Sequence, residues 1–208
     1  MLYTTSTFIY FIPLLIGLYY LSHLPRSLRL VVLAVLIDGL VNSYGFLLYV
    51  SQEKNTSVLL NFYIVPHLLL WSLPPIVSIK SKSYKNGIVG LTLMSCALVI
   101  FYTVGFHTEL ELNGKALAIV GAHLIFLHLI YIYYISVESK LLSFRYHPLF
   151  SIACAILLYQ TFNTVIFAQM NHLDAMSLTF LWKFKHVTYI ILHLVIAIVI
   201  YWYGRLRA

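Results

Sequence analysis

Residues 180–203 read FLWKFKHVTYIILHLVIAIVIYWY, an almost unbroken run of apolar and aromatic side chains. A helix needs about 20 mostly apolar residues to cross the hydrocarbon core of a bilayer, and this run is long enough to do so. Six windows of the same kind precede it. The seven windows are 6–22, 28–50, 58–79, 87–105, 115–136, 148–168 and 180–203. The sequence therefore predicts an all-α integral membrane protein, a bundle of seven spanning helices.

The composition leads to the same fold class. Of the 208 residues, 62% are hydrophobic and 9% are charged, whereas about a quarter of the residues of a soluble domain are charged. The apolar residues are spread over the whole chain, which leaves no separate stretch of roughly 50 residues or more for a soluble domain. We therefore expect residues 1–208 to form a single transmembrane domain in contact with the lipid bilayer.

The basic residues predict the orientation of the bundle. The net charge of +7 does not indicate a nucleic-acid partner, because the basic residues are scattered in short loops and form no basic face. Cytoplasmic loops are enriched in Lys and Arg. Alternate loops on one side hold nine of the thirteen basic residues, namely Arg26, Arg29, Lys80, Lys82, Lys85, Lys140, Arg145, Arg205 and Arg207. We therefore expect a multi-pass protein of the cell (inner) membrane, with its N-terminus outside and its C-terminus in the cytoplasm.

A weak internal repeat relates the first three windows to the last three. Asn42 corresponds in this way to Asn163, and Tyr63 followed by His67 corresponds to Trp182 followed by His186. The pattern fits a parallel three-plus-one-plus-three arrangement with window 87–105 as the linker. Chance matching within apolar sequence is the alternative explanation.

Ionisable residues inside the predicted spans are the natural candidates for function, because Asp or Lys at the centre of a membrane helix costs roughly 2.5–3.5 kcal/mol on insertion scales. Asp38 lies in the middle of window 28–50. It has two interpretations. It is a site for a proton, a cation or a ligand amine, or it is a carboxyl group bonded to a neighbouring helix.

Histidines and aromatic residues form two helical stripes. One consists of Leu60, Tyr63, His67 and Trp71, and the other of Trp182, His186, Tyr189 and His193. Spacings of three and four residues place each stripe on one helix face, so we expect the two to line a polar seam. Taken singly, each histidine also fits a hydrogen bond across a helix interface. The predicted ligand-binding residues are Asp38, Asn42, Tyr63, His67, His123, His128, Asn163, Trp182, Lys183, His186 and His193.

The same residues argue against familiar catalytic centres. Seven-helix zinc hydrolases of the ceramidase and progestin-receptor-like type carry a His-x-x-x-His pair in the last helix, which window 180–203 lacks. We therefore predict no metal site and no catalytic residue. A haem held by one histidine from each of two helices stays open, and the sequence names no other cofactor.

Lysines and prolines in the spans carry two further expectations. Lys183 and Lys185 lie within about two turns of the outer end of their helix, unlike a mid-helix retinal lysine, and are expected to reach the outer interface or to attract an anion. Pro66, Pro74 and Pro75 are expected to interrupt helix 58–79 and to free backbone carbonyls inside the protein.

Four features carry a resemblance to a group of proteins. They are LPRSLR at 24–29, the acid Asp38 in mid-helix, Asn61-Phe62-Tyr63 at the start of a helix, and Trp182 with His186. With these features the chain resembles small seven-helix membrane proteins of Bacteroidetes-type bacteria, which are similar to the membrane sensor region of some histidine kinases. Members of the group often have a carboxylate where this chain has Pro66-His67. The resemblance covers the chain loosely and names neither a function nor a ligand.

These observations lead to one expectation of function and its alternatives. We expect a receptor-like or sensor bundle that binds a small ligand or ion in an outward-facing polar pocket and signals through a separate cytoplasmic partner. The alternative is a small-molecule or ion transporter or channel. An intramembrane metal-dependent hydrolase or a haem-binding electron carrier ranks below both, so an enzyme is not the favoured interpretation.

Overall fold

The computed structural model describes residues 5–6, 8–51, 56–105, 113–138, 147–169, 172 and 174–208. Within these residues the α-helices are α2 (Phe11–Tyr19), α3 (Arg26–Val50), α4 (Thr56–Ser78), α5 (Lys82–Gly105), α6 (Gly114–Glu138), α7 (Pro148–Gln169) and α8 (Ala175–Arg205), and a 3-10 helix, η1, spans Leu21–His23. The predicted all-α fold is confirmed, since the described residues form seven α-helices and no strand.

The helices α3 to α8 have the length and hydropathy to cross a bilayer, so the chain is a multi-pass membrane protein. The helix of the first predicted window is shorter than expected. Thr5, Ser6 and Phe8 are helical, Ile9 and Tyr10 form a turn, and α2 beyond the turn has 9 residues, which span about 14 Å against a hydrocarbon core of about 30 Å. Pro13 favours a helix start at this point, because it lacks the N–H that would continue a helix from further upstream. The crossing of this first segment stays a prediction.

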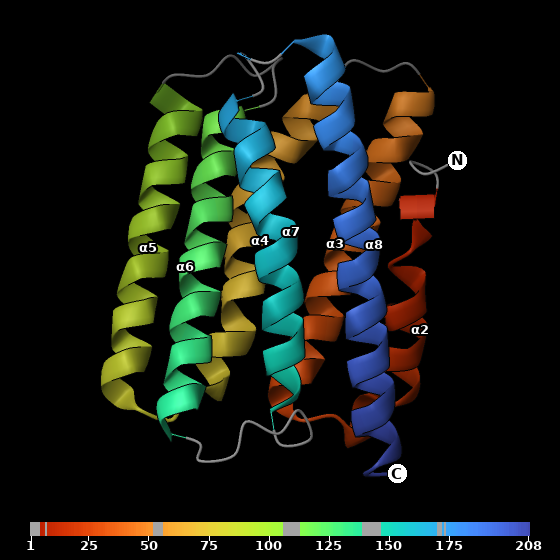
Figure 1. The fold of residues 1–208 in the computed structure, drawn as a ribbon, viewed down its shortest axis with the longest axis vertical. Helices are drawn as coiled ribbons and strands as arrows, with labels where there is room; N and C mark the ends of the chain where they lie inside the picture. Colours follow the sequence, from red (N-terminus) through yellow and green to blue (C-terminus); the bar gives the residue numbers. More distant parts are fainter. Residues whose placement is uncertain are drawn as a thin grey trace.

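Successive helices run in alternating directions and pack side by side (Figure 1). The helix α2 packs against α8 and closes the ring, α4 also contacts α6, and α5 lies at one edge against α4 and α6. The contacts among α2, α3, α4, α6, α7 and α8 map onto themselves when the first three helices are exchanged with the last three, but the packing of α5 against α4 and α6 does not. The pattern fits the three-plus-one-plus-three repeat, with α5 as the linker.

The alternation gathers most of the basic residues at one end of the bundle, which we call the basic end. The starts of α3 and α5 and the end of α8 lie there (Figure 1). The described basic residues at this end are Arg26, Arg29, Lys80, Lys82, Lys85, Arg205 and Arg207. Lys140 and Arg145 lie outside the described residues. The charge asymmetry behind the predicted orientation is therefore retained in the folded chain.

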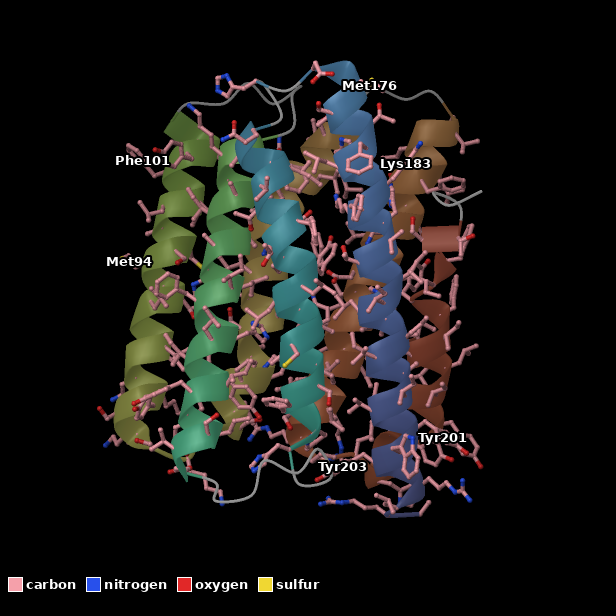
Figure 2. The ribbon with its side chains drawn as sticks, in the orientation of Figure 1. Met94, Phe101, Met176, Lys183, Tyr201 and Tyr203 are labelled. Carbon is pink, nitrogen blue, oxygen red and sulfur yellow. The ribbon has the colours of Figure 1, made fainter. Side chains whose placement is uncertain are left out.

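The outer surface of the bundle suits a lipid environment. Figure 2 shows Met94 and Phe101 projecting outward from α5, and these side chains are 57% and 58% exposed. The same view places Tyr201 on α8 near the basic end, and Trp202 beside it is also exposed. Tyr and Trp are enriched where membrane helices meet the headgroup region. The exposed apolar residues are therefore expected on a lipid-facing surface.

The helix α4 is continuous from Thr56 to Ser78 and includes Pro66, Pro74 and Pro75. The expected interruption is therefore wrong. Proline is tolerated within membrane helices because neighbouring helices, hydroxyl side chains and small local adjustments satisfy the backbone groups that it frees.

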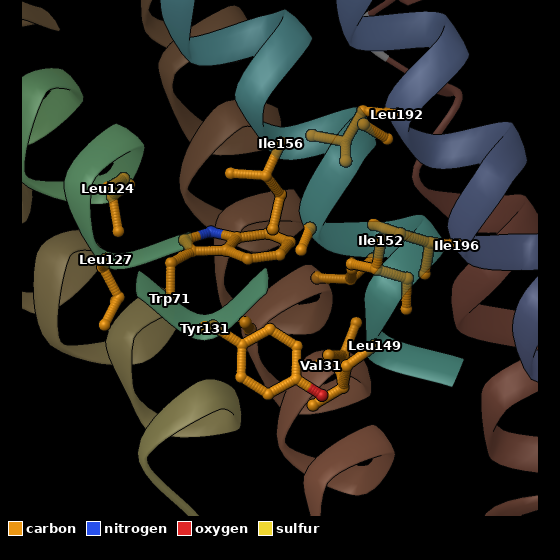
Figure 3. Close-up of a cluster of buried hydrophobic side chains, with 14 of the residues drawn as sticks. Val31, Trp71, Leu124, Leu127, Tyr131, Leu149, Ile152, Ile156, Leu192 and Ile196 are labelled. Carbon is orange, nitrogen blue, oxygen red and sulfur yellow. The ribbon is translucent and has the colours of Figure 1, made fainter. Parts of the chain in front are cut away.

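A layer of buried side chains fills the bundle from its middle toward the basic end (Figure 3). We call it the apolar layer, and it consists of Val31, Trp71, Leu124, Leu127, Tyr131, Leu149, Ile152, Ile156, Leu192 and Ile196. Nearer the basic end, Gly204 of α8 lies in close contact with Tyr20. There is no room for a side chain at this position, since an added Cβ would lie 2.3 Å from Tyr20 Cγ. This half of the molecule is closely packed.

Candidate ligand-binding cavity

A cavity of about 360 Å³ lies between α3, α4, α6, α7 and α8. Its volume is at the low end of the range of roughly 300–1,000 Å³ that is usual for small-molecule sites. Its polar lining residues are Ser6, Asp38, Asn42, Tyr63, His67, Tyr159, Gln160, Asn163, Lys185, His186, Tyr189 and His193. Its other lining residues are Leu60, Ile64, Trp71, Leu117, Val120, Ile156, Phe167, Trp182 and Leu192. By their position along the helices, these residues lie from the middle of the bundle toward the end opposite the basic end.

One wall of the cavity is built around Asp38 of α3, which is 5% exposed. The Tyr63 hydroxyl donates to Asp38 Oδ1, and His67 Nδ1 lies 3.0 Å from the same oxygen. The Trp71 indole N–H donates to Oδ2 at 2.7 Å. Tyr63, His67 and Trp71 are four residues apart, so they project from one face of α4. Both carboxyl oxygens are therefore engaged by a neighbouring helix, which fits the second of the two interpretations of Asp38.

The facing wall is built by α8. His193 is fully buried, and its Nδ1 lies 2.9 Å from the carbonyl oxygen of Tyr189. A carbonyl oxygen only accepts, so Nδ1 carries the proton and Nε2 is a bare acceptor. This Nε2 has no hydrogen-bond partner among the described residues. The Tyr189 hydroxyl accepts from Asn42 Nδ2 at 3.4 Å, which joins α8 to α3.

Toward the outer end of this wall, Lys185 lies between aromatic rings. Its Nζ is 4.2 Å from the centroid of the Trp182 ring and 4.8 Å from that of Phe167 on α7. In His186, the next residue, the Nδ1 atom lies 2.9 Å from the hydroxyl oxygen of Ser6. The rings attract the ammonium through their quadrupole. The lysine is thus directed toward the cavity.

The helix α7 contributes two amides to the cavity. Asn163 Nδ2 donates to Gln160 Oε1 at 3.2 Å. Asn163 is 8% exposed, and its Oδ1 has no partner among the described residues. This oxygen and His193 Nε2 are two buried acceptors on residues that line the cavity, and neither has a partner among the described residues.

All of the predicted ligand-binding residues line this cavity except His123, His128 and Lys183. Lys183 is exposed, which agrees with the expected position at the outer interface. The two histidines are buried on α6, away from the cavity lining. His128 Nδ1 donates to the carbonyl of Leu124 in its own helix at 2.7 Å.

His123 lies in a cluster of three hydroxyls, which we call the His123 cluster. The Ser72 and Thr92 hydroxyls donate to the carbonyls of Leu68 and Ile88, at 2.7 and 2.9 Å. Their oxygens therefore accept from His123 Nε2, at 3.1 and 3.4 Å. The Ser95 hydroxyl donates to Nδ1 at 3.0 Å. Both ring nitrogens are engaged, so His123 joins α6 to α4 and α5 and offers a ligand no open position.

Sequence reasoning missed Lys185, Gln160 and Tyr159 as cavity residues. Lys185 is three residues after Trp182 and four before Tyr189, so its spacing already puts it on the face of the predicted stripe. Gln160 likewise precedes Asn163 by one helical turn. Tyr159 has no comparable signal, because aromatic residues are frequent throughout the helices.

Among the described residues, no group of three or more His, Cys, Asp or Glu side chains is arranged to hold a metal ion. Comparison of the chain with known protein families, with curated proteins and with solved structures finds no match. The fold and the cavity define the class of protein: a multi-pass α-helical membrane protein with a polar cavity in one half of its bundle.

Proposed function

We propose that this protein is a receptor-like sensor of the inner membrane that binds a small ligand in the cavity and signals through a separate cytoplasmic partner. The observation that carries the proposal is the cavity itself, with two buried acceptors, His193 Nε2 and Asn163 Oδ1, that lack partners among the described residues. An unpaired buried polar group costs roughly 1–3 kcal/mol. A ligand that pairs with both groups removes this cost.

The orientation of the cavity supports an external ligand. The cavity lies toward the end opposite the basic end, and the positive-inside rule assigns the basic end to the cytoplasm. On this assignment the cavity lies in the half of the bundle nearer the outside of the cell, which is the side from which an extracellular molecule would approach it.

The floor of the cavity favours a sensor over a channel. Trp71, Ile156 and Leu192 line the cavity and also belong to the apolar layer. They are between 3% and 4% exposed. A polar solute that continued toward the basic end would have to cross this buried apolar packing. A transporter is the second candidate, and the repeated contacts of α2, α3 and α4 with α6, α7 and α8 favour it.

A ligand screen tests the proposal. The purified protein in detergent is expected to show a saturable rise in melting temperature with at least one compound of a broad metabolite panel. Val120→Phe fills the cavity from α6 and is expected to abolish the rise. Val104→Phe is the matched control, because Val104 is 81% exposed on α5. A panel without a saturable response in the wild-type protein contradicts the proposal. Ligand uptake into proteoliposomes, lost in Asp38→Asn, would favour the transporter.

A further inference from the structure

The charges in the cavity indicate which kind of ligand it takes. Among the described residues, the ion pair between His67 and Asp38 is the only one. Asp38 Oδ1 accepts from two groups and Oδ2 from a third, so this carboxyl group is already satisfied by α4. Lys185 lines the same cavity and has no acidic partner within the described part of the chain. An anion is therefore the group that complements the cavity.

The surroundings of Lys185 leave its donors available. The ammonium lies over the Trp182 and Phe167 rings, at 4.2 and 4.8 Å from their centroids. An ammonium has three N–H donors, and ring faces attract its charge without supplying strong acceptors. A ligand carboxylate gives these donors acceptors and matches the single positive charge. A phosphate dianion would leave its second charge without a partner on the lysine.

The rest of the ligand must donate hydrogen bonds. His193 Nε2 and Asn163 Oδ1 are acceptors only, and neither has a partner among the described residues. Lys185 and His193 are eight residues apart on α8, which is about 12 Å along the helix axis. Tyr189 lies between them, with its ring centroid 5.4 Å from that of Tyr159. The cavity is therefore charged at its outer end, aromatic in its middle and accepting at its deep end.

Building on the sensor function proposed above, we propose that the ligand is an elongated aromatic carboxylate with a hydroxyl group at its far end. The carboxylate binds the Lys185 ammonium, and the aromatic body lies beside Tyr159 and Tyr189. The far hydroxyl donates to His193 Nε2. A second donor on the ligand chain, where present, binds Asn163 Oδ1.

A matched series of four probes tests both ends of this ligand on the wild-type protein. The reference is para-hydroxyphenylpropanoate, and its amide and amine analogues replace the carboxylate by a neutral or a cationic group. Phenylpropanoate removes the hydroxyl instead. Affinities are measured by titration calorimetry in detergent. The reference is expected to bind about tenfold more tightly than the amide or phenylpropanoate, as one lost charge-assisted or buried hydrogen bond predicts, and the amine is not expected to bind.

Variants then assign each end to a residue. Lys185→Gln is expected to remove the preference for the carboxylate over the amide, and Lys185→Arg to keep it. Lys183→Gln is the matched control, because Lys183 is exposed and lies outside the cavity lining. His193→Phe is expected to remove the preference for the hydroxyl. Helical circular dichroism verifies that each variant is folded.

The outcomes separate this inference from the proposed function. Tighter binding of the amine or the amide than of the carboxylate overturns the inference and leaves the sensor function intact. Absence of binding by all four probes, while another metabolite gives a saturable thermal shift, also overturns the inference alone. Absence of any response in the probe series and in the broad panel overturns both.

Discussion

His123 and His193 are buried histidines in long helices, 5% and 0% exposed, and the sequence predicts the same ligand-binding role for both. Their surroundings differ. His123 has hydroxyls from two neighbouring helices on both ring nitrogens. His193 bonds only through Nδ1, to a carbonyl of its own helix, and Nε2 is left without a partner among the described residues.

The difference shows what a polar side chain does inside a helical membrane bundle. Where the facing helices bring short hydroxyl side chains within reach, the imidazole is saturated and holds helices together. Where the facing helices stand apart around a cavity, the imidazole keeps an open acceptor. The residue type alone does not distinguish a histidine that joins helices from one that offers an acceptor to a ligand. Four substitutions are expected to show this distinction.

The largest effect is expected at Asp38, where a saturated polar cluster borders the cavity. Asp38→Ala removes the acceptor of Tyr63, His67 and Trp71. At about 1 kcal/mol for each of three hydrogen bonds, the free energy of unfolding should fall by roughly 3 kcal/mol. Titration with a denaturing detergent, followed by circular dichroism, measures the loss. Asp38→Asn keeps an acceptor and should lose less. An Ala variant as stable as wild type would show that the packing of α4 against α3 does not depend on this carboxyl group.

A smaller loss is expected in the His123 cluster. His123→Leu leaves the Ser72 and Thr92 hydroxyls with their carbonyl acceptors, so only Ser95 loses its partner. The free energy of unfolding should fall by about 1 kcal/mol, and ligand affinity should not change. The same unfolding titration and a ligand titration measure the two quantities. A marked fall in affinity would break the distinction between the two histidines.

At His193 the effect on stability should be smaller still. His193→Phe gives up one hydrogen bond to Tyr189, but it also removes a buried acceptor that has no partner among the described residues. These two changes oppose each other, so the free energy of unfolding should change by less than about 0.5 kcal/mol. Affinity for a hydroxylated ligand should fall at the same time. A variant that is strongly destabilised would place His193 among the structural histidines.

The smallest effect is expected at Asp174, which is exposed at the start of α8. The Ser177 side chain and the N–H groups of Ser177 and Met176 donate to its carboxylate and lower the pKa of Asp174 below its ordinary value of 3.8. Because the pKa is lower in the folded state, the stabilisation is complete above pH 3.8 and is lost as the pH falls through the folded pKa.

Asp174→Ala should therefore lower the melting temperature slightly at neutral pH, and the difference from wild type should disappear in acid. Melting curves of both proteins at several pH values measure this. A difference that persists in acid would mean that the side chain acts through packing instead of its charge.

Much of the cavity could be anticipated from helical spacing. The stripe around His67 does lie along one face of α4, and the stripe around His186 does line the opposite wall. Spacing places residues on one face of a helix, but it does not say which faces meet. For this reason the sequence grouped His123 with the cavity and left two positions open for Lys185, one at the outer interface and one beside a bound anion.

The sequence by itself determined the membrane-spanning class and the positions of six long helices, because apolar length and composition are properties of each segment alone. It also determined which residues share a helix face. Tertiary structure decided that Asp38 meets α4 and that Lys185 turns toward the cavity. It decided these because hydrogen bonds and cavities form between helices, and the rotation of each helix against its neighbours is set by packing over the whole bundle.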